Sequence, residues 1–198
     1  LRDIQMNVRT TVKKCDSFGM TKSALCAASV SRGTINATRP KQFDGGIHMK
    51  KINEFTGTEV LLSGKWKMAY LKNGVKKNYT CADDIYNDNI NIIDATVPGN
   101  IELDLYNAGL CADPLFGNNP DTVRRETENL HSYYFREFIV DEIKGLPFLT
   151  FEGIDCYSDI FLNGQKIAET DNMLIEHKIA VGDYLKEGKN HLFVHIKP

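Results

Sequence analysis

Residues 159–168 read DIFLNGQKIA, and this stretch decides the fold class. Two strand-like runs, Asp159–Leu162 and Gln165–Ala168, stand on either side of Asn163-Gly164. An Asn-Gly pair tolerates the positive φ angles that a type I′ turn needs, and it is the strongest short-range signal for a β-hairpin. The sequence therefore predicts an antiparallel hairpin here.

Further strand patterns lie on both sides of this hairpin, with turn residues between them. They are Val60–Leu71 (which contains the turn residues Ser63-Gly64), Tyr133–Val140, Phe148–Phe151, Leu174–Ala180 and the alternating end of the chain at 191–197. Closely spaced strands with little helix between them are typical of an antiparallel sandwich. The predicted fold is all-β.

The last of these strands alternates, with Leu192, Val194 and Ile196 on one face. Such alternation predicts a half-buried strand. His191 and His195 fall on the opposite face, so we expect both to be surface histidines.

One short helix is predicted at Asn100–Asn107, after Pro98-Gly99 and before Gly109, which is placed to end it. A second short helix or a loop is expected around Glu126 and Glu128, whose side chains we expect to be solvated. The fold should therefore contain one or two short helices.

Residues 1–55 read differently from the rest of the chain. Residues 1–48 carry eight Lys or Arg against three acids and show no sustained period of two or 3.6 residues. We expect residues 1–55 to be a flexible or poorly defined N-terminal extension and residues 56–198 to be the folded domain.

Composition excludes several classes of function. The net charge is -2, which gives no reason to expect nucleic acid or an acidic membrane surface as a partner. The five cysteines are scattered without a CxxC pair or zinc-like histidine spacing, so neither a metal nor another cofactor is predicted. Free thiols are the simplest interpretation; they slightly favour the cytoplasm without fixing a location.

No catalytic residue can be nominated from the sequence. The chain has no GxSxG, HExxH, Walker or GxGxxG motif. A glycosidase carboxylate pair must face each other across a sugar, and no two positions are singled out by sequence.

Two turns combine amide or carboxylate residues with apolar ones. They are Asp113–Asn119 (DPLFGNN) and Thr170–Met173 (TDNM). Sugar sites use amide and carboxylate groups to bind hydroxyls and apolar rings to cover C–H faces. The same residues also form turns for conformational reasons alone, so both interpretations stay open.

Several motifs follow one another in a family-specific order. They are Leu62-Ser63-Gly64-Lys65-Trp66, 95–100 (ATVPGN), 113–119 (DPLFGNN), 131–138 (HSYYFREF), 151–155 (FEGID), 160–164 (IFLNG), 171–173 (DNM) and 188–192 (GKNHL). In this order they resemble the N-terminal sugar-binding domain of family 2 glycoside hydrolases, in particular the β-mannosidase-like members. The resemblance implies a jelly-roll β-sandwich of the galactose-binding-like type.

The resemblance also implies a division of labour. In the family this domain precedes an immunoglobulin-like domain and a catalytic barrel, and such a barrel needs about 250 residues of its own. We expect these downstream domains of the same enzyme and a β-linked glycoside as partners, and no hydrolysis by this chain alone.

Family relatives place loops of this first domain at the barrel mouth. By order, the corresponding segments carry Asn118, Asn119, Asp171 and Asn172, which we expect to bind substrate hydroxyls or to support groups that do. Trp66, the only tryptophan, is expected in the core.

Two other functions remain open from the sequence. The chain could be an autonomous carbohydrate-binding module of the same fold, which titration with sugars would reveal. It could also be a protein-interaction sandwich that pairs through an exposed sheet edge.

Overall fold

The computed structural model describes residues 8–13, 59–72, 77–143 and 145–198, and these belong to one compact unit. The fold is all-β, as predicted. Its strands are β1 (Val8–Lys13), β2 (Glu59–Leu61), β3 (Gly64–Lys72), β4 (Ile92–Val97), β5 (Leu130–Val140), β6 (Leu146–Phe151), β7 (Ser158–Leu162), β8 (Gln165–Thr170), β9 (His177–Ala180) and β10 (Gly188–Ile196). The helices of the described residues are α1 (Ala82–Asn87), α2 (Ile101–Asn107) and α3 (Asn119–Thr127).

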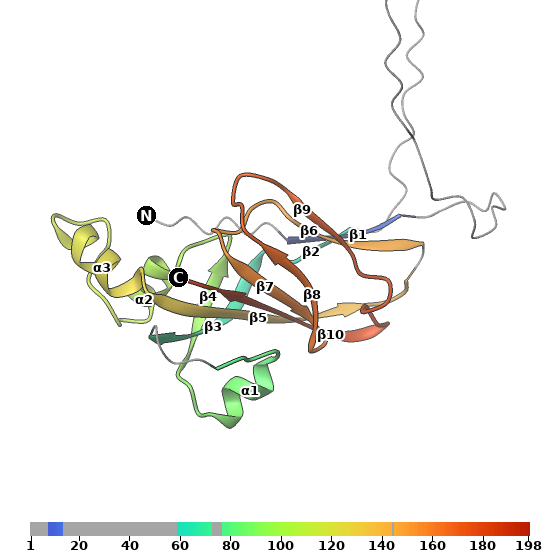
Figure 1. Cartoon of the computed structure of the whole chain (residues 1–198), viewed down its shortest axis with the longest axis horizontal. Coiled ribbons are helices and arrows are strands. Elements are labelled where there is room, and N and C mark those ends of the chain that lie inside the picture. The colour runs from blue at the N-terminus through green and yellow to red at the C-terminus, as the bar shows by residue number, and fades with distance from the viewer. Residues whose placement is uncertain (1–7, 14–58, 73–76, 144) are drawn as a thin grey trace, which may run out of the picture. The chain divides into compact units, whose positions relative to one another are not determined.

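The strands form two antiparallel sheets. The larger one has the order β4-β3-β5-β10-β7-β8, and the smaller one has the order β2-β1-β6-β9. The long pairing of β5 with β10, from Gly188 opposite Val140 to Ile196 opposite Ser132, forms the centre of the larger sheet. In Figure 1 the smaller sheet lies on one side of the larger sheet and α1 lies on the other.

Strand β1 falls inside the segment predicted as an extension. It pairs with β6 from Val8 opposite Phe151 to Lys13 opposite Leu146. The rest of residues 1–55 lies outside the described residues, so the boundary before residue 56 stays a prediction.

The predicted Asn-Gly hairpin is present between β7 and β8. Asn163 and Gly164 have φ angles of 53° and 80°, as a type I′ turn requires. The Asn163 side chain also accepts a hydrogen bond from the His191 backbone N–H at 3.0 Å and donates one to the Tyr184 carbonyl at 2.8 Å. The turn is therefore tied to the start of β10 as well as closing its own hairpin.

The main hydrophobic core lies between the two sheets. Trp66 belongs to it, with 2% of its surface exposed, and its indole N–H donates to the Leu62 carbonyl at 2.7 Å. This confirms the predicted core position of the tryptophan. Met68, Leu149, Ile160 and Val194 are among the fully buried members of the same cluster.

A second cluster occupies the opposite face of the larger sheet. It contains Phe135, Phe193 and Phe161 from three neighbouring strands, and Tyr79 and Ile85 from the α1 region cover part of it. We call this side the outer face, and the side that meets the smaller sheet the inner face.

The outer face corrects the prediction for the last strand. β10 is buried on both faces from Leu192 onward, and His195 is only 9% exposed, whereas His191 is exposed. The expectation of a surface histidine is therefore wrong for His195, because Tyr133 and His131 of β5 and Asp159 of β7 surround its ring on a face that alternation alone assigns to solvent.

Some element bounds also differ from the prediction. The run Val60–Leu71 divides at Ser63, so that β2 and β3 belong to different sheets. The described residues contain three short helices rather than one or two, and the strand expected at Leu174–Ala180 begins only at His177.

None of the helices in the described residues has the length and apolar character needed to cross a bilayer.

Candidate functional site

The first predicted turn, 113–119, joins α2 to α3. The Asp113 carboxylate accepts a hydrogen bond from the Leu115 N–H at 2.9 Å, and the Phe116 N–H donates to the Asp113 carbonyl at 3.3 Å. The Asn119 side chain donates to that same carbonyl at 3.0 Å. Asp113 is therefore the centre of a braced loop, in the manner of an Asx turn.

This braced loop presents two large apolar side chains to solvent. Leu115 and Phe116 are 72% and 73% exposed. Asn118, the N-cap residue of α3, is also exposed and makes no side-chain capping bond. Of the two predicted asparagines, Asn118 thus has an amide available to a ligand, whereas the amide of Asn119 holds the loop together.

The second predicted turn connects β8 to β9. The Asn172 side chain accepts a hydrogen bond from the Leu174 N–H at 2.9 Å, and the Asn172 carbonyl lies 2.8 Å from His177 Nε2. Asp171 is exposed and lines a shallow depression of about 370 Å³ together with Tyr157 and Lys197. Asn172 therefore shapes the turn, and Asp171 is the more accessible group.

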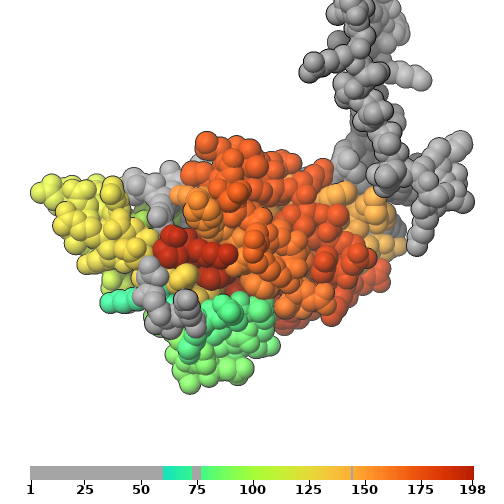
Figure 2. All heavy atoms as spheres, in the orientation of Figure 1, coloured from blue at the N-terminus to red at the C-terminus, as the bar shows by residue number. Residues whose placement is uncertain are grey.

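Neither of two surface cavities on the described part of the chain joins the two turns. The depression beside Asp171 has no lining residue from 113–119, and the cavity beside α3 is lined by neither turn. Figure 2 shows the α2–α3 segment (yellow) and the β8–β9 region (orange) as separate parts of one surface. A joint role of Asn118, Asn119, Asp171 and Asn172 at one sugar therefore stays a prediction.

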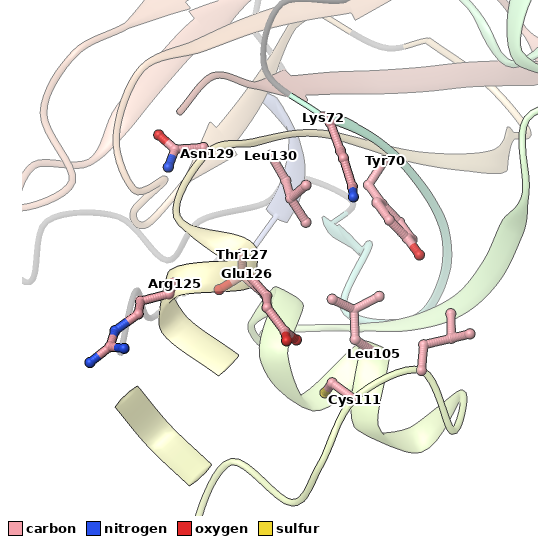
Figure 3. A pocket seen from close by; sticks show the side chains of 10 residues that line it. Tyr70, Lys72, Leu105, Cys111, Arg125, Glu126, Thr127, Asn129 and Leu130 are labelled. Carbon is pink, nitrogen blue, oxygen red and sulfur yellow. The ribbon is translucent and has the colours of Figure 1, made fainter. Parts of the chain in front are cut away.

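The cavity beside α3 measures about 510 Å³ and is drawn in Figure 3. Lys72 from β3 and Glu126 from α3 point into it, Leu105 of α2 forms an apolar wall, and the Arg125 side chain points away. Burial raises the pKa of the Cys111 thiol, which also lines the cavity. That thiol is therefore protonated at neutral pH and is a poor nucleophile.

Two carboxylates of α2 are buried beneath this region, which the sequence did not predict. Asp104 accepts hydrogen bonds from the Thr96 N–H at 3.0 Å and from the Tyr134 hydroxyl at 3.2 Å. Glu102 accepts one from the Thr127 hydroxyl at 3.2 Å. These bonds attach α2 to β4, β5 and α3.

Burial raises the pKa of Asp104 to about 6, although the bonds from Thr96 and Tyr134 favour its ionised form. The carboxyl groups of Asp104 and Glu102 are enclosed by protein, with 3% and 4% of each residue exposed. They cannot flank a sugar as a glycosidase pair must. The two carboxylates instead help to pack α2 against its neighbours. No catalytic residue is assigned among the described residues.

No group of three or more His, Cys, Asp or Glu side chains within the described part of the chain is arranged to hold a metal ion. Cys81, Cys111 and Cys156 are free thiols in that part.

The two antiparallel sheets and the braced turns at their surface define the class of this protein as an all-β sandwich domain. A family model described as "Glycosyl hydrolase 2 galactose-binding domain-like" matches residues 73–198. The chain belongs to this family, which confirms the resemblance seen in the motifs.

Individual relatives point to the same group. A probable beta-mannosidase of Caenorhabditis elegans is 33% identical over 104 residues, which are 52% of this chain and 11% of the relative. Beta-mannosidase B of Thermothelomyces thermophilus is 34% identical over 99 residues, 49% of this chain and 12% of the relative. The chain thus spans about a tenth of the length of these curated relatives.

A solved structure agrees with these relatives. The crystal structure of the beta-D-mannosidase from Dictyoglomus thermophilum matches with a TM-score of 0.56 and 36% identity, covering 69% of this chain and 15% of that chain. The chain is therefore a β-mannosidase-like domain of family 2 glycoside hydrolases.

Proposed function

We propose that this chain is the non-catalytic N-terminal domain of a β-mannosidase-like glycosidase, which hydrolyses O-glycosyl bonds of β-linked mannosides. In that role it scaffolds a catalytic barrel and shapes the barrel's sugar pocket. Its partners are the glycoside and the downstream immunoglobulin-like and barrel domains of the same enzyme.

The observation that carries this proposal is the braced turn at 113–119. Exposed apolar side chains on a surface mark contact sites when they are neighbours rather than scattered. Leu115 and Phe116 are neighbours, and the bonds to Asp113 hold them outward. They suit docking against the barrel, and the free Asn118 amide beside them suits a substrate hydroxyl.

The β8–β9 turn supports the same role through similar features. Leu174 and Ile175 are exposed by 84% and 50%, next to the accessible Asp171 carboxylate. If Leu174 and Ile175 pack against a neighbouring domain, the Asp171 carboxylate on the same short loop would lie at the boundary between the two domains. We assign Asp171 and Asn118 to substrate hydroxyls, and Asn119 and Asn172 to bracing these two turns.

The non-catalytic part of the proposal is tested by incubating the pure 198-residue chain with p-nitrophenyl β-mannoside. We expect no release of nitrophenol above the blank. Turnover that co-purifies with the chain would show that it carries its own catalytic groups.

The pocket-shaping part is tested in the polypeptide that continues into the catalytic domain. Loss of one hydrogen bond to a substrate hydroxyl should raise KM for the aryl mannoside about three- to tenfold in Asn118→Ala. Asn87→Ala, which removes an exposed amide from α1, is the matched control and should leave KM unchanged. Equal kinetics for the two variants would place the 113–119 turn away from the sugar.

A further inference from the structure

A groove on the outer face is separate from both turns. It encloses about 630 Å³ between α1 and strands β3, β4, β5 and β10. Figure 1 shows α1 on the side of the larger sheet opposite the smaller sheet. We call this cavity the α1 groove.

An aromatic side chain stands at the wall of the α1 groove. Tyr86 of α1 is 55% exposed, and its ring lies edge-to-face against Phe135 with centroids 6.2 Å apart and planes at 73°. Phe135 is itself buried in the outer cluster. The contact holds one side of the Tyr86 ring and leaves much of its surface open to a ligand, and such a ring suits the C–H face of a sugar.

Charged pairs with hydrogen-bonding capacity line the same groove. Lys67 and Asp94 form an ion pair at 2.6 Å on β3 and β4. Glu137 lies 2.7 Å from Lys189 and 3.4 Å from His191 on the β5–β10 side. Each pair orients its members while leaving carboxylate lone pairs and ammonium protons for further hydrogen bonds.

Two further groups of the α1 groove are unused within the described residues. Lys65 and Asp83 line it, and their side chains form no hydrogen bond or ion pair there, although the Lys65 charge acts on Asp94. The groove therefore offers both donors and acceptors with little net charge.

This chemistry selects one class of ligand. An anion would meet the carboxylates of Asp83, Asp94 and Glu137, and a purely apolar ligand would leave the charged walls without hydrogen bonds. A neutral polyhydroxy compound can satisfy both signs of charge and stack on Tyr86. The volume also lies within the range of roughly 300–1,000 Å³ that small-molecule sites occupy.

We infer that the α1 groove is a second carbohydrate site, which binds a β-linked hexose oligosaccharide by stacking on Tyr86 and by hydrogen bonds to the flanking side chains. The inference rests on the carbohydrate partner of the proposed function, but it uses none of the residues of the two turns. It gives the domain a place to hold substrate chain or product away from the catalytic pocket.

Calorimetric titration of the pure chain with β-1,4-mannobiose and with cellobiose tests the inference. We expect saturable binding with a Kd of about a millimolar, since the site is open and shallow. Tyr86→Ala should weaken binding at least about tenfold, because the stacking of the sugar on the aromatic ring is lost. Tyr86→Phe keeps the ring and should keep the binding. Tyr106→Ala is the control, because Tyr106 is an exposed tyrosine on α2 outside the groove.

Circular dichroism of each variant shows whether the fold is retained, and Tyr86→Phe supplies a second measurement if Tyr86→Ala unfolds. Absence of binding to either disaccharide overturns the inference. Binding that survives Tyr86→Ala but is lost in Asn118→Ala also overturns it and assigns the sugar to the 113–119 turn. In both cases the kinetic test of the proposed function is unaffected, so the two failures are distinguishable.

Discussion

The two faces of the larger sheet differ in chemistry although they share the same strands. The inner face carries aliphatic residues such as Met68, Ile160 and Val194, which meet the smaller sheet in the main core. The outer face carries Phe193 and His195, and among the described residues the short α1 region covers part of it. The inner face therefore holds the two sheets together, while the outer face also carries charged pairs such as Lys67–Asp94.

The first prediction compares neighbouring residues of β7 that point to opposite faces. Ile160 is fully buried on the inner face, and Phe161 lies on the outer face with its ring against Phe193 at 6.0 Å. Ile160→Ala should cost about 3–4 kcal/mol of unfolding free energy because it leaves a cavity. Phe161→Ala should cost about 2 kcal/mol, although the deleted side chain is larger, because its cover is incomplete.

Urea unfolding of the two variants measures this difference. A larger loss for Phe161→Ala than for Ile160→Ala would show that the outer cluster, and not the interior of the sandwich, dominates stability.

The second prediction uses the buried histidine of the outer face. His195 stacks on Tyr133 with centroids 4.5 Å apart, lies 3.0 Å from His131 Nδ1 through its Nε2, and faces Asp159 at 3.8 Å. Burial, assisted by His131 and opposed by Asp159, lowers the pKa of His195 from 6.5 to about 4. Between pH 6.5 and about 4 the unfolded chain therefore takes up a proton at this histidine that the folded chain does not.

The contribution of His195 to stability is therefore complete above pH 6.5 and is lost as the pH falls toward 4, by about 3 kcal/mol. Relative to wild type, His195→Gln should lack this loss when unfolding is measured across the same range. His191→Gln, an exposed position on the same strand, is the control and should follow wild type.

The third prediction concerns the inner side, where Asp104 of α2 bonds to Tyr134 of the main core. Its folded pKa of about 6 lies above the usual value of 3.8 for an aspartate, so between these pH values the folded state keeps a proton that the unfolded state releases. Stability from this group is present below pH 3.8 and is lost as the pH rises through 6, by up to about 3 kcal/mol. This slope is opposite to that of His195.

Asp104→Asn should therefore leave a chain whose stability rises more steeply between pH 4 and about 6 than that of wild type. Thermal unfolding at several pH values measures the slope. A parallel pH profile for the variant and wild type would mean that Asp104 ionises in the folded state as easily as in the unfolded one.

The contrast between the faces also explains what the sequence could reveal. The Asn163-Gly164 hairpin and the Asn100–Asn107 helix were predictable because their signals lie within a few residues. Asn100 does cap α2, its side chain accepting from the Leu103 N–H at 2.9 Å. The burial of His195 was not predictable, because its neighbours His131 and Asp159 come from other strands.

The candidate site shows the same limit. Asn118 and Asn119 are identical and adjacent in sequence, but only the structure shows that Asn119 is bound to Asp113 while Asn118 lacks a side-chain capping bond. The α1 groove was missed entirely, because its walls come from α1 and from strands distant along the chain. A local motif can indicate a turn, but it does not assemble a cavity.

The fourth and smallest expected effect concerns the cover of the outer face. The Tyr79 hydroxyl donates to the Asp88 carboxylate at 2.6 Å, which joins the two ends of the α1 region. Tyr79→Phe removes this bond and should cost about 1 kcal/mol. Hydrogen exchange should become faster in α1 and stay unchanged in β6 and β10, because the inner face does not depend on α1.

Tyr106→Phe on α2, where the hydroxyl is on an exposed ring, is the matched control. Faster exchange throughout both sheets in Tyr79→Phe would mean that the outer cover is part of the same cooperative unit as the core.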